Sequence, residues 1–131
     1  MIVLDASAVV ELVLNSARGS RVRERISDVE ETLAAPHLLT IEVLQVLRRF
    51  TARSAISASR AEAALADLMA LDVEYWDHEA FLPRVWALRG NLTAYDAIYV
   101  ALAEGLDAPL VTTDGRLGGS PGHRAQVDVI R

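Results

Sequence analysis

The sequence predicts an α/β fold in which helices cover both faces of a central, mainly parallel β-sheet. Short apolar segments suited to buried strands alternate along the chain with longer segments whose apolar residues recur at helical spacing. In addition, 52% of the 131 residues are hydrophobic, which is enough to build a substantial core. No repeat, low-complexity tract or linker divides the chain, so we expect residues 1–131 to form one domain.

The first half of the chain begins with the apolar stretch MIVLD, which predicts a short buried strand. The polar stretch NSARGS is expected to separate the first two helices, and Pro36 to end the second strand. Ser57 can cap the helix that follows it. The expected elements are a strand at 1–5, helices at 6–14 and 21–27, a strand at 32–36, and helices at 37–50 and 58–71.

The second half continues the same alternation. Residues 97–103 are apolar on every side of their helix, which is typical of a helix inside a domain. Parallel sheets covered by helices bind ligands at the carboxyl ends of their strands, so residues that follow strands are the first candidates for a site. The expected elements are a strand at 73–76, helices at 79–89 and 94–104, a strand at 108–114, and an edge strand at 125–130.

Composition excludes several kinds of chemistry. The chain has no cysteine, which rules out disulfides, thiol catalysis and thiolate metal sites. All 13 basic residues are arginine, so chemistry that needs lysine is excluded as well. The formal charge of −5 argues against a protein that coats nucleic acid, but not against a nuclease with an acidic active site. No apolar run approaches the length of a membrane span and the start lacks a basic targeting region, so we expect a cytoplasmic protein without membrane contact.

Four acidic residues occupy positions from which their side chains could meet. Asp5 and Asp114 end the first and fourth expected strands, so both lie at the carboxyl edge of the sheet. Asp96 lies in the first turn of the apolar helix, and Glu42 near the start of another largely apolar helix. Singly, each has an ordinary alternative as a helix cap, a turn residue or a solvated helix residue. Together, their consistent positions favour one common site.

A cluster of four carboxylates needs a cation. Mutual repulsion would leave at least one of them protonated unless positive charge neutralises the cluster. Hard oxygen ligands suit Mg²⁺ or Mn²⁺ rather than zinc. Two such ions about 3.5–4 Å apart can hold an in-line displacement at phosphorus, one activating water and the other stabilising the leaving oxygen. The four acids therefore indicate metal-dependent hydrolysis of a phosphodiester.

At these residues the sequence resembles the PIN-domain family, specifically the VapC toxins of bacterial toxin–antitoxin pairs. The resemblance covers essentially the whole chain and rests on four stretches, MIVLDASAVVELVL, TIEVLQVLRR, LTAYDAIYVALAE and LVTTDGRL. It implies a three-layer α/β/α sandwich with strand order 3-2-1-4-5 and a Mg²⁺- or Mn²⁺-dependent endoribonuclease. By matching motif positions, the catalytic and metal-coordinating acids would be Asp5, Glu42, Asp96 and Asp114.

The resemblance also implies supporting residues and partners. Ser7 and Thr112 match hydroxyls that lie close to the site and would bond to the acids or to metal-bound water. The family implies a homodimer, and a small VapB-like antitoxin whose C-terminal segment covers the site, often with an arginine approaching the acids. Many relatives carry Asn three residues after the helix glutamate, where this chain has Gln45. We therefore expect altered geometry at substrate contacts rather than lost chemistry.

Three further residues are candidate RNA contacts. Arg48 and Arg49 follow Glu42 on the same helix and could track phosphates, which would make RNA binding salt-dependent; a solvated helix face is the alternative. Tyr95 adjoins Asp96 and could stack on a base, with core packing as the ordinary alternative.

Two other functions stay open on the sequence alone. The same fold could act on DNA or on a structured nucleic acid, which cleavage assays on RNA and DNA in parallel would decide. It could also be a non-catalytic partner-binding module whose acids hold an arginine of an antitoxin. Removing the metal would leave such a module unchanged.

Overall fold

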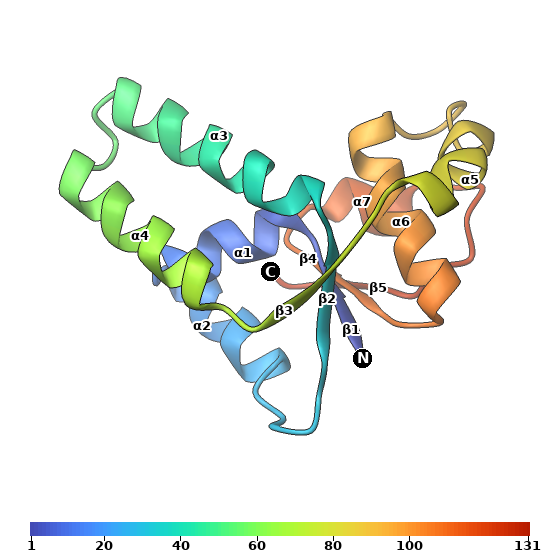
Figure 1. The fold of residues 1–131 in the computed structure, drawn as a ribbon, viewed down its shortest axis with the longest axis horizontal. Coiled ribbons are helices and arrows are strands. Elements are labelled where there is room, and N and C mark those ends of the chain that lie inside the picture. The colour runs from blue at the N-terminus through green and yellow to red at the C-terminus, as the bar shows by residue number, and fades with distance from the viewer.

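The centre of the molecule is a five-stranded parallel sheet (Figure 1). The computed structural model describes residues 1–131. The strand order is β3-β2-β1-β4-β5 and every neighbouring pair runs parallel, which confirms the expected sheet and its order. The strands are β1 (Ile2–Leu4), β2 (Leu33–Pro36), β3 (Val73–Trp76), β4 (Leu110–Thr112) and β5 (Val127–Val129).

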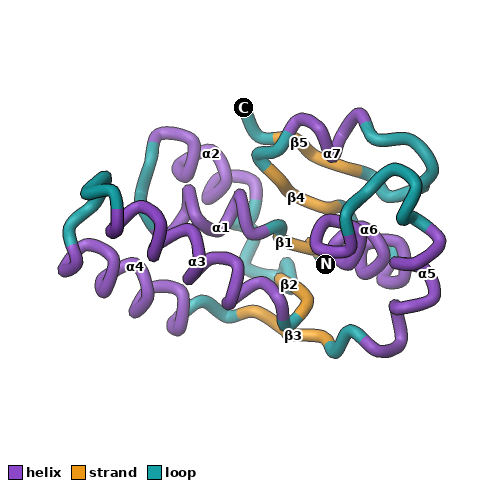
Figure 2. The backbone as a smooth tube through the Cα atoms, turned by 90° about the horizontal axis from the view of Figure 1, so that it is seen from above, coloured by secondary structure: helices purple, strands orange, loops and turns teal.

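Helices flank this sheet on both sides and complete the expected three-layer sandwich. The helices are α1 (Ala6–Val13), α2 (Ala17–Arg25), α3 (Leu38–Ala52), α4 (Ala58–Ala70), α5 (Leu82–Ala87), α6 (Ala94–Leu106) and α7 (Gly115–Gly119). Figure 2 shows α1 to α4 on one side of the sheet, and α5 and α6 on the other. Because β1 and β4 lie between these two layers, every residue of both strands is buried.

Helix α6 is the buried helix that its apolar sequence predicts. Residues 97–103 are all at most 4% exposed, and the helix packs on β1, β2 and β4. The Thr93 hydroxyl caps it by accepting a hydrogen bond from the backbone N–H of Asp96 at 3.2 Å. Because α6 leads into β4, its first turn lies at the carboxyl edge of the sheet. Neither α6 nor any other helix has both the length and the apolar character needed to cross a membrane.

The second helix starts earlier than expected. The stretch NSARGS was predicted to separate two helices, with the second starting at Arg21, but α2 begins at Ala17. The Ser16 hydroxyl caps it by accepting a hydrogen bond from the backbone N–H of Gly19 at 2.9 Å. Gly19 also allows α1 and α2 to approach closely, since a Cβ there would lie 2.1 Å from the Glu11 carbonyl oxygen. The break between the helices is therefore only a short turn.

Two other segments differ from their expected structure. The helix predicted at 79–89 is a 3₁₀ turn over Glu79–Phe81 followed by α5, which has Pro83 in its first turn. Proline suits the first turn of a helix, so it marks a new start there rather than a continuous helix. Helix α7 was not predicted. Its cap is Asp114, whose side chain accepts a hydrogen bond from the backbone N–H of Arg116.

Helices α3 and α4 form a pair that extends away from the sheet (Figure 1). An open, largely apolar groove of about 420 Å³ lies between them, with Leu44, Leu47 and Leu65 in its lining. This groove is separate from the carboxyl edge of the sheet, where the acidic residues lie.

Candidate active site

Four carboxylates from four separate segments line one open pocket at the carboxyl edge of the sheet. Asp5 follows β1, Glu42 lies on α3, Asp96 lies in the first turn of α6, and Asp114 caps α7 just after β4. The pocket has a volume of about 330 Å³. All four acids singled out in the sequence thus meet in space, although their role as catalytic metal ligands stays a prediction.

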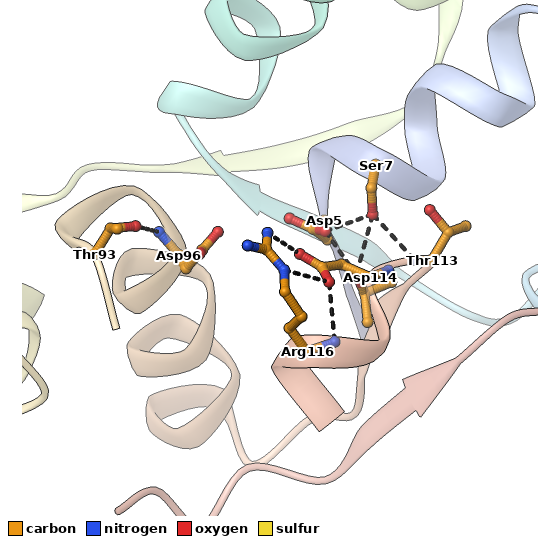
Figure 3. A network of polar contacts seen from close by, with 8 residues as sticks. Asp5, Ser7, Thr93, Asp96, Thr113, Asp114 and Arg116 are labelled. Carbon is orange, nitrogen blue, oxygen red and sulfur yellow. Dashed lines mark hydrogen bonds and ion pairs between the residues drawn. The ribbon is translucent and has the colours of Figure 1, made fainter. Parts of the chain in front are cut away.

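Asp5 is held by two hydroxyl groups (Figure 3). Asp5 is only 7% exposed. Its Oδ2 accepts hydrogen bonds from Ser7 Oγ at 2.6 Å and from Thr112 Oγ1 at 2.7 Å. The backbone N–H of Thr113 donates to Ser7 Oγ, and that of Asp114 donates to Thr112 Oγ1, each at 3.0 Å. Asp5 occupies the cap position of α1 but makes no side-chain capping bond. Its Oδ1 is therefore left for the pocket.

Glu42 is held by Tyr99, a residue of the buried helix α6. The Tyr99 hydroxyl donates to Glu42 Oε1 at 2.6 Å, and Tyr99 is only 1% exposed. Burial raises the pKa of Glu42, and the charges of Asp5 and Asp96 raise it further, against the effect of the Tyr99 hydrogen bond. Burial, followed by the contact with Glu42, also raises the pKa of Tyr99 far above its ordinary range. Tyr99 therefore stays protonated and remains a donor.

Asp96 points from the start of α6 toward the other acids (Figure 3). Burial raises the pKa of its carboxyl, and the charges of Asp5 and Asp114 add to that effect. The nearby guanidinium of Arg116 and the hydroxyl of Thr93 act in the opposite direction. The Thr93 hydroxyl also accepts a hydrogen bond from the backbone N–H of Asp96 and so caps the helix.

Asp114 is paired with Arg116 in a two-pronged contact. Arg116 Nε donates to Asp114 Oδ1 at 3.1 Å, and Arg116 Nη2 donates to Oδ2 at 2.8 Å. The backbone N–H of Arg116 also donates to Oδ1 at 2.9 Å. These hydrogen bonds from Arg116 lower the pKa of Asp114, in contrast to Glu42 and Asp96. One basic side chain thus reaches into the acidic pocket from α7.

The donor set of this pocket fits a hard divalent cation. The four acids supply carboxylate oxygens, which are the hard donors that such an ion prefers. Burial and the charges of neighbouring acids make ionisation of Glu42 and Asp96 unfavourable, and a bound cation would offset that effect. The four acids line one pocket, but no group of three or more acidic or histidine side chains stands close enough to hold one ion. A bound ion would therefore require side-chain rotation, most evidently at Asp114, whose two oxygens both contact Arg116.

The candidate RNA contacts fall in different places. Arg49 and Gln45 line the acidic pocket. Arg48 lines the groove between α3 and α4, although it is the neighbour of Arg49 in sequence. Tyr95 is 63% exposed and lines a small apolar pocket between α5 and α6. Of the three candidate RNA contacts Arg48, Arg49 and Tyr95, the structure brings Arg49 to the acidic pocket, and Gln45 lies there as well.

Tyr99 and Arg116 were missed in the sequence, and both contact a predicted acid. Tyr99 lies three residues after Asp96, so helical spacing alone could have put both side chains on one face of α6. Arg116 follows Asp114 by two residues, and nothing in the sequence indicates that its side chain folds back over that carboxylate. From the sequence, Tyr99 is expected only to pack in the core as part of the apolar run 97–103.

Comparison with known sequences identifies the family of the chain. The PIN-domain profile matches residues 2–118. Ribonuclease VapC12 of Mycobacterium tuberculosis is 41% identical over 130 residues, which cover 99% of both chains. Ribonuclease VapC1 of the same organism is 40% identical over 131 residues, covering 98% of this chain and 97% of the relative. The chain therefore belongs to the PIN-domain family. Within that family it is of the VapC type.

Solved structures give the same fold. The chain from a Klebsiella pneumoniae toxin–antitoxin complex superimposes with a TM-score of 0.72 at 18% identity, covering 100% of this chain and 98% of its own. PAE2754 from Pyrobaculum aerophilum gives a TM-score of 0.69 at 26% identity, covering 98% of this chain and 83% of its own. Mycobacterium tuberculosis VapC20, described as a toxin that cleaves the sarcin–ricin loop, gives a TM-score of 0.69 at 15% identity, covering 91% of this chain and 94% of its own. The likenesses to the Klebsiella pneumoniae chain and to VapC20, at 18% and 15% identity, are evidence of fold alone.

Proposed function

We propose that this chain is a metal-dependent endoribonuclease that acts as the toxin of a toxin–antitoxin pair. The observation that carries the proposal is the convergence of four carboxylates on one pocket. Three relatives named as VapC ribonucleases, 38–41% identical to this chain over nearly all of its length, support RNA as the substrate. The reaction is hydrolysis of a phosphodiester bond within an RNA strand.

The proposed cofactor is Mg²⁺, with Mn²⁺ as a substitute. Asp5, Glu42, Asp96 and Asp114 would hold it, since they supply the hard oxygen donors that these ions prefer. When bound, such an ion makes water more acidic and offsets the negative charge that builds up on the phosphate.

Neighbouring hydroxyl groups fix the positions of two of these acids, Asp5 and Glu42. Ser7 and Thr112 hold one oxygen of Asp5, so the direction of the other oxygen is set. Tyr99 does the same for Glu42 from the opposite side. Such hydrogen bonds to ligand side chains are worth about 10–100-fold in metal affinity or activity. Arg49 lines the same pocket and supplies positive charge for a phosphate of the strand.

The proposed protein partners are a VapB-like antitoxin and a second copy of this chain. Structural neighbours include VapBC2 from Rickettsia felis bound to a promoter DNA fragment, and DNA-bound VapBC from Salmonella typhimurium. They support a VapB-like antitoxin as the partner. Its C-terminal segment would cover the acidic pocket. Co-purification with the product of a neighbouring short reading frame would test this pairing, and light scattering of the free chain would test the homodimer.

The activity is tested by incubating antitoxin-free protein with total cellular RNA, in Mg²⁺ or Mn²⁺ and in chelator. We expect discrete fragments with metal and none with chelator. Asp96→Asn should lower the rate by at least about 100-fold, the scale of losing one group that stabilises charge in the transition state. Asp72→Asn is the matched control, since it removes one exposed carboxylate away from the pocket.

Each outcome has a definite meaning. Cleavage that needs both metal and Asp96 supports the proposal, and mapping the fragment ends identifies the target. Cleavage that survives Asp96→Asn contradicts the site assignment. If folded protein cleaves no RNA with either metal, a partner-binding role is favoured instead. If DNA is cut as readily as RNA, the protein is a general phosphodiesterase.

A further inference from the structure

Arg116 is a basic side chain of the acidic pocket, and it makes hydrogen bonds to one of the four acids, Asp114. Its guanidinium contacts both oxygens of Asp114, at 3.1 and 2.8 Å. Figure 3 shows it on the side of Asp114 that faces Asp96. The proposed function leaves Arg116 without a role.

The contact has a consequence for cation binding. Asp114 Oδ1 accepts two N–H groups of Arg116, and Oδ2 accepts one from Nη2, so neither oxygen of Asp114 is free of Arg116. A divalent ion placed among the acids would also lie close to the guanidinium, which feels the charges of both Asp114 and Asp96. Like charges repel, so the ion and the guanidinium compete for the same negative charge.

The guanidinium is free to leave. The Arg116 side chain is 87% exposed, and its hydrogen bonds from the side chain go only to Asp114. Exposed ion pairs of this kind are weak. The backbone of Arg116 lies in the five-residue helix α7 at the rim of the pocket, so a displaced guanidinium stays next to the acids. Its planar fork of donors suits two oxygens of a phosphate as well as it suits a carboxylate.

We propose that Arg116 is the chain's own counter-cation for the acidic pocket, that it is displaced from Asp114 by the divalent ion, and that it then binds a phosphate of the RNA strand. The inference rests on the proposed function and names a phosphate-binding residue for it. It predicts opposite effects of one substitution: metal should bind more tightly without Arg116, and RNA should bind more weakly.

The first measurement is Mn²⁺ binding to metal-stripped protein by calorimetry. Arg116→Ala should bind Mn²⁺ about 3–10-fold more tightly than the wild type, because no guanidinium competes for Asp114. Arg116→Lys should fall between the two, since an ammonium keeps the charge but loses the fork. Arg21→Ala is the matched control for net charge, because Arg21 is exposed on α2 and distant from the pocket. It should change the affinity by less than about twofold.

The second measurement is binding of a fluorescent, randomised single-stranded RNA, with Ca²⁺ in place of Mn²⁺. Arg116→Ala should weaken this binding by about tenfold and reduce its salt dependence by about one phosphate contact. If Arg116 mattered only through the backbone N–H that Asp114 caps, both the metal affinity and the RNA affinity would stay unchanged. Thermal unfolding of each variant checks that the fold is retained.

The outcomes separate this inference from the proposed function. Mn²⁺ affinity that is unchanged or lowered in folded Arg116→Ala overturns the inference, even if the wild type cleaves RNA. RNA affinity unchanged in that variant overturns the phosphate contact. Conversely, tighter Mn²⁺ binding with weaker RNA binding supports the inference even if no cleavage is found. If no variant binds Mn²⁺, competition for Asp114 is disproved.

Discussion

At the scale of single residues, the pocket is organised by hydroxyl groups that hold carboxylates. Tyr99 is the clearest case, since its hydroxyl is buried in the core and donates to Glu42 at 2.6 Å. A buried tyrosine hydroxyl needs a partner, and a half-buried glutamate needs a donor, so each residue satisfies the other. The same pair also fixes where one acid of the pocket lies.

Tyr99→Phe should weaken Mn²⁺ binding and RNA cleavage by about 10–100-fold, because Glu42 loses the donor that orients it. The free energy of unfolding should fall by only about 1 kcal/mol, since the ring and its packing stay in place. Calorimetry and denaturant unfolding measure the two effects separately. Tyr75→Phe is the matched control, because the Tyr75 hydroxyl makes no hydrogen bond to Glu42 or any other site residue. Equal metal affinity in Tyr99→Phe and the wild type would show that Tyr99 only fills the core.

The sequence predicts the four acids and, through the family resemblance, the Ser7 and Thr112 hydroxyls that hold Asp5, but it does not predict Tyr99 or Arg116. Asp5 and Asp114 follow strands, and strand ends of a parallel sheet meet at one edge, so their convergence follows from the fold class. Tyr99 stands in an apolar run, where its hydroxyl gives no sign of a polar partner. Arg116 contacts Asp114 through a side-chain conformation, and no sequence pattern specifies that conformation.

At the scale of secondary-structure elements, a buried carboxylate clamps α6 to its neighbours. The side chain of Glu104 on α6 is 1% exposed and accepts two hydrogen bonds from Arg84 of α5, at 2.7 and 3.0 Å. It also accepts one from the backbone N–H of Arg124 at 2.9 Å. Arg84 further contacts the Gly122 carbonyl at 3.3 Å. One glutamate thereby joins α5, α6 and the segment that leads into β5.

Glu104→Gln should lower the free energy of unfolding by roughly 2 kcal/mol at neutral pH, the scale of hydrogen bonds to a charged group. The hydrogen bond from Arg84 is the main cause that lowers the pKa of Glu104 below its ordinary 4.5. The native state therefore binds this proton more weakly than the unfolded chain does. The ionised Glu104 therefore stabilises the fold fully above pH 4.5, and this stabilisation is lost as the pH falls through the lowered pKa of Glu104.

Urea unfolding of the wild type and Glu104→Gln across this pH range measures the effect. The difference between them should be largest at neutral pH and should shrink in acid. Glu62→Gln, which alters an exposed glutamate of α4, should show no such trend. A difference that stays constant down to acid pH would mean that Glu104 stabilises the fold through packing rather than charge.

The elements themselves follow from the sequence wherever the pattern is long. Helices α3, α4 and α6 were placed within two residues, because each combines an apolar pattern with a recognisable start. The errors fall on short segments. The early start of α2 depends on the Ser16 cap, and the division of 79–89 depends on Pro83. Helix α7 has only five residues, which is too few for a periodic pattern.

At the scale of the whole molecule, the charge balance opposes RNA binding. The chain carries a formal charge of −5, and four of its carboxylates line the proposed active site, where the phosphates must come. A bound cation offsets part of this repulsion, and arginines close to the pocket must supply the remainder. The position of each arginine therefore matters more than the total number.

Arg48 and Arg49 allow a direct test of this argument, since they are sequence neighbours on α3 that face different surfaces. Arg49 lines the acidic pocket, whereas Arg48 lines the apolar groove between α3 and α4. Arg49→Ala should weaken the binding of single-stranded RNA by about 3–10-fold and lower the slope of log affinity against log salt by about one. Arg48→Ala changes the net charge equally but should have a much smaller effect on both quantities. If the two variants lose equal affinity, net charge rather than position governs RNA binding, and the strand does not pass along the side of the pocket formed by α3.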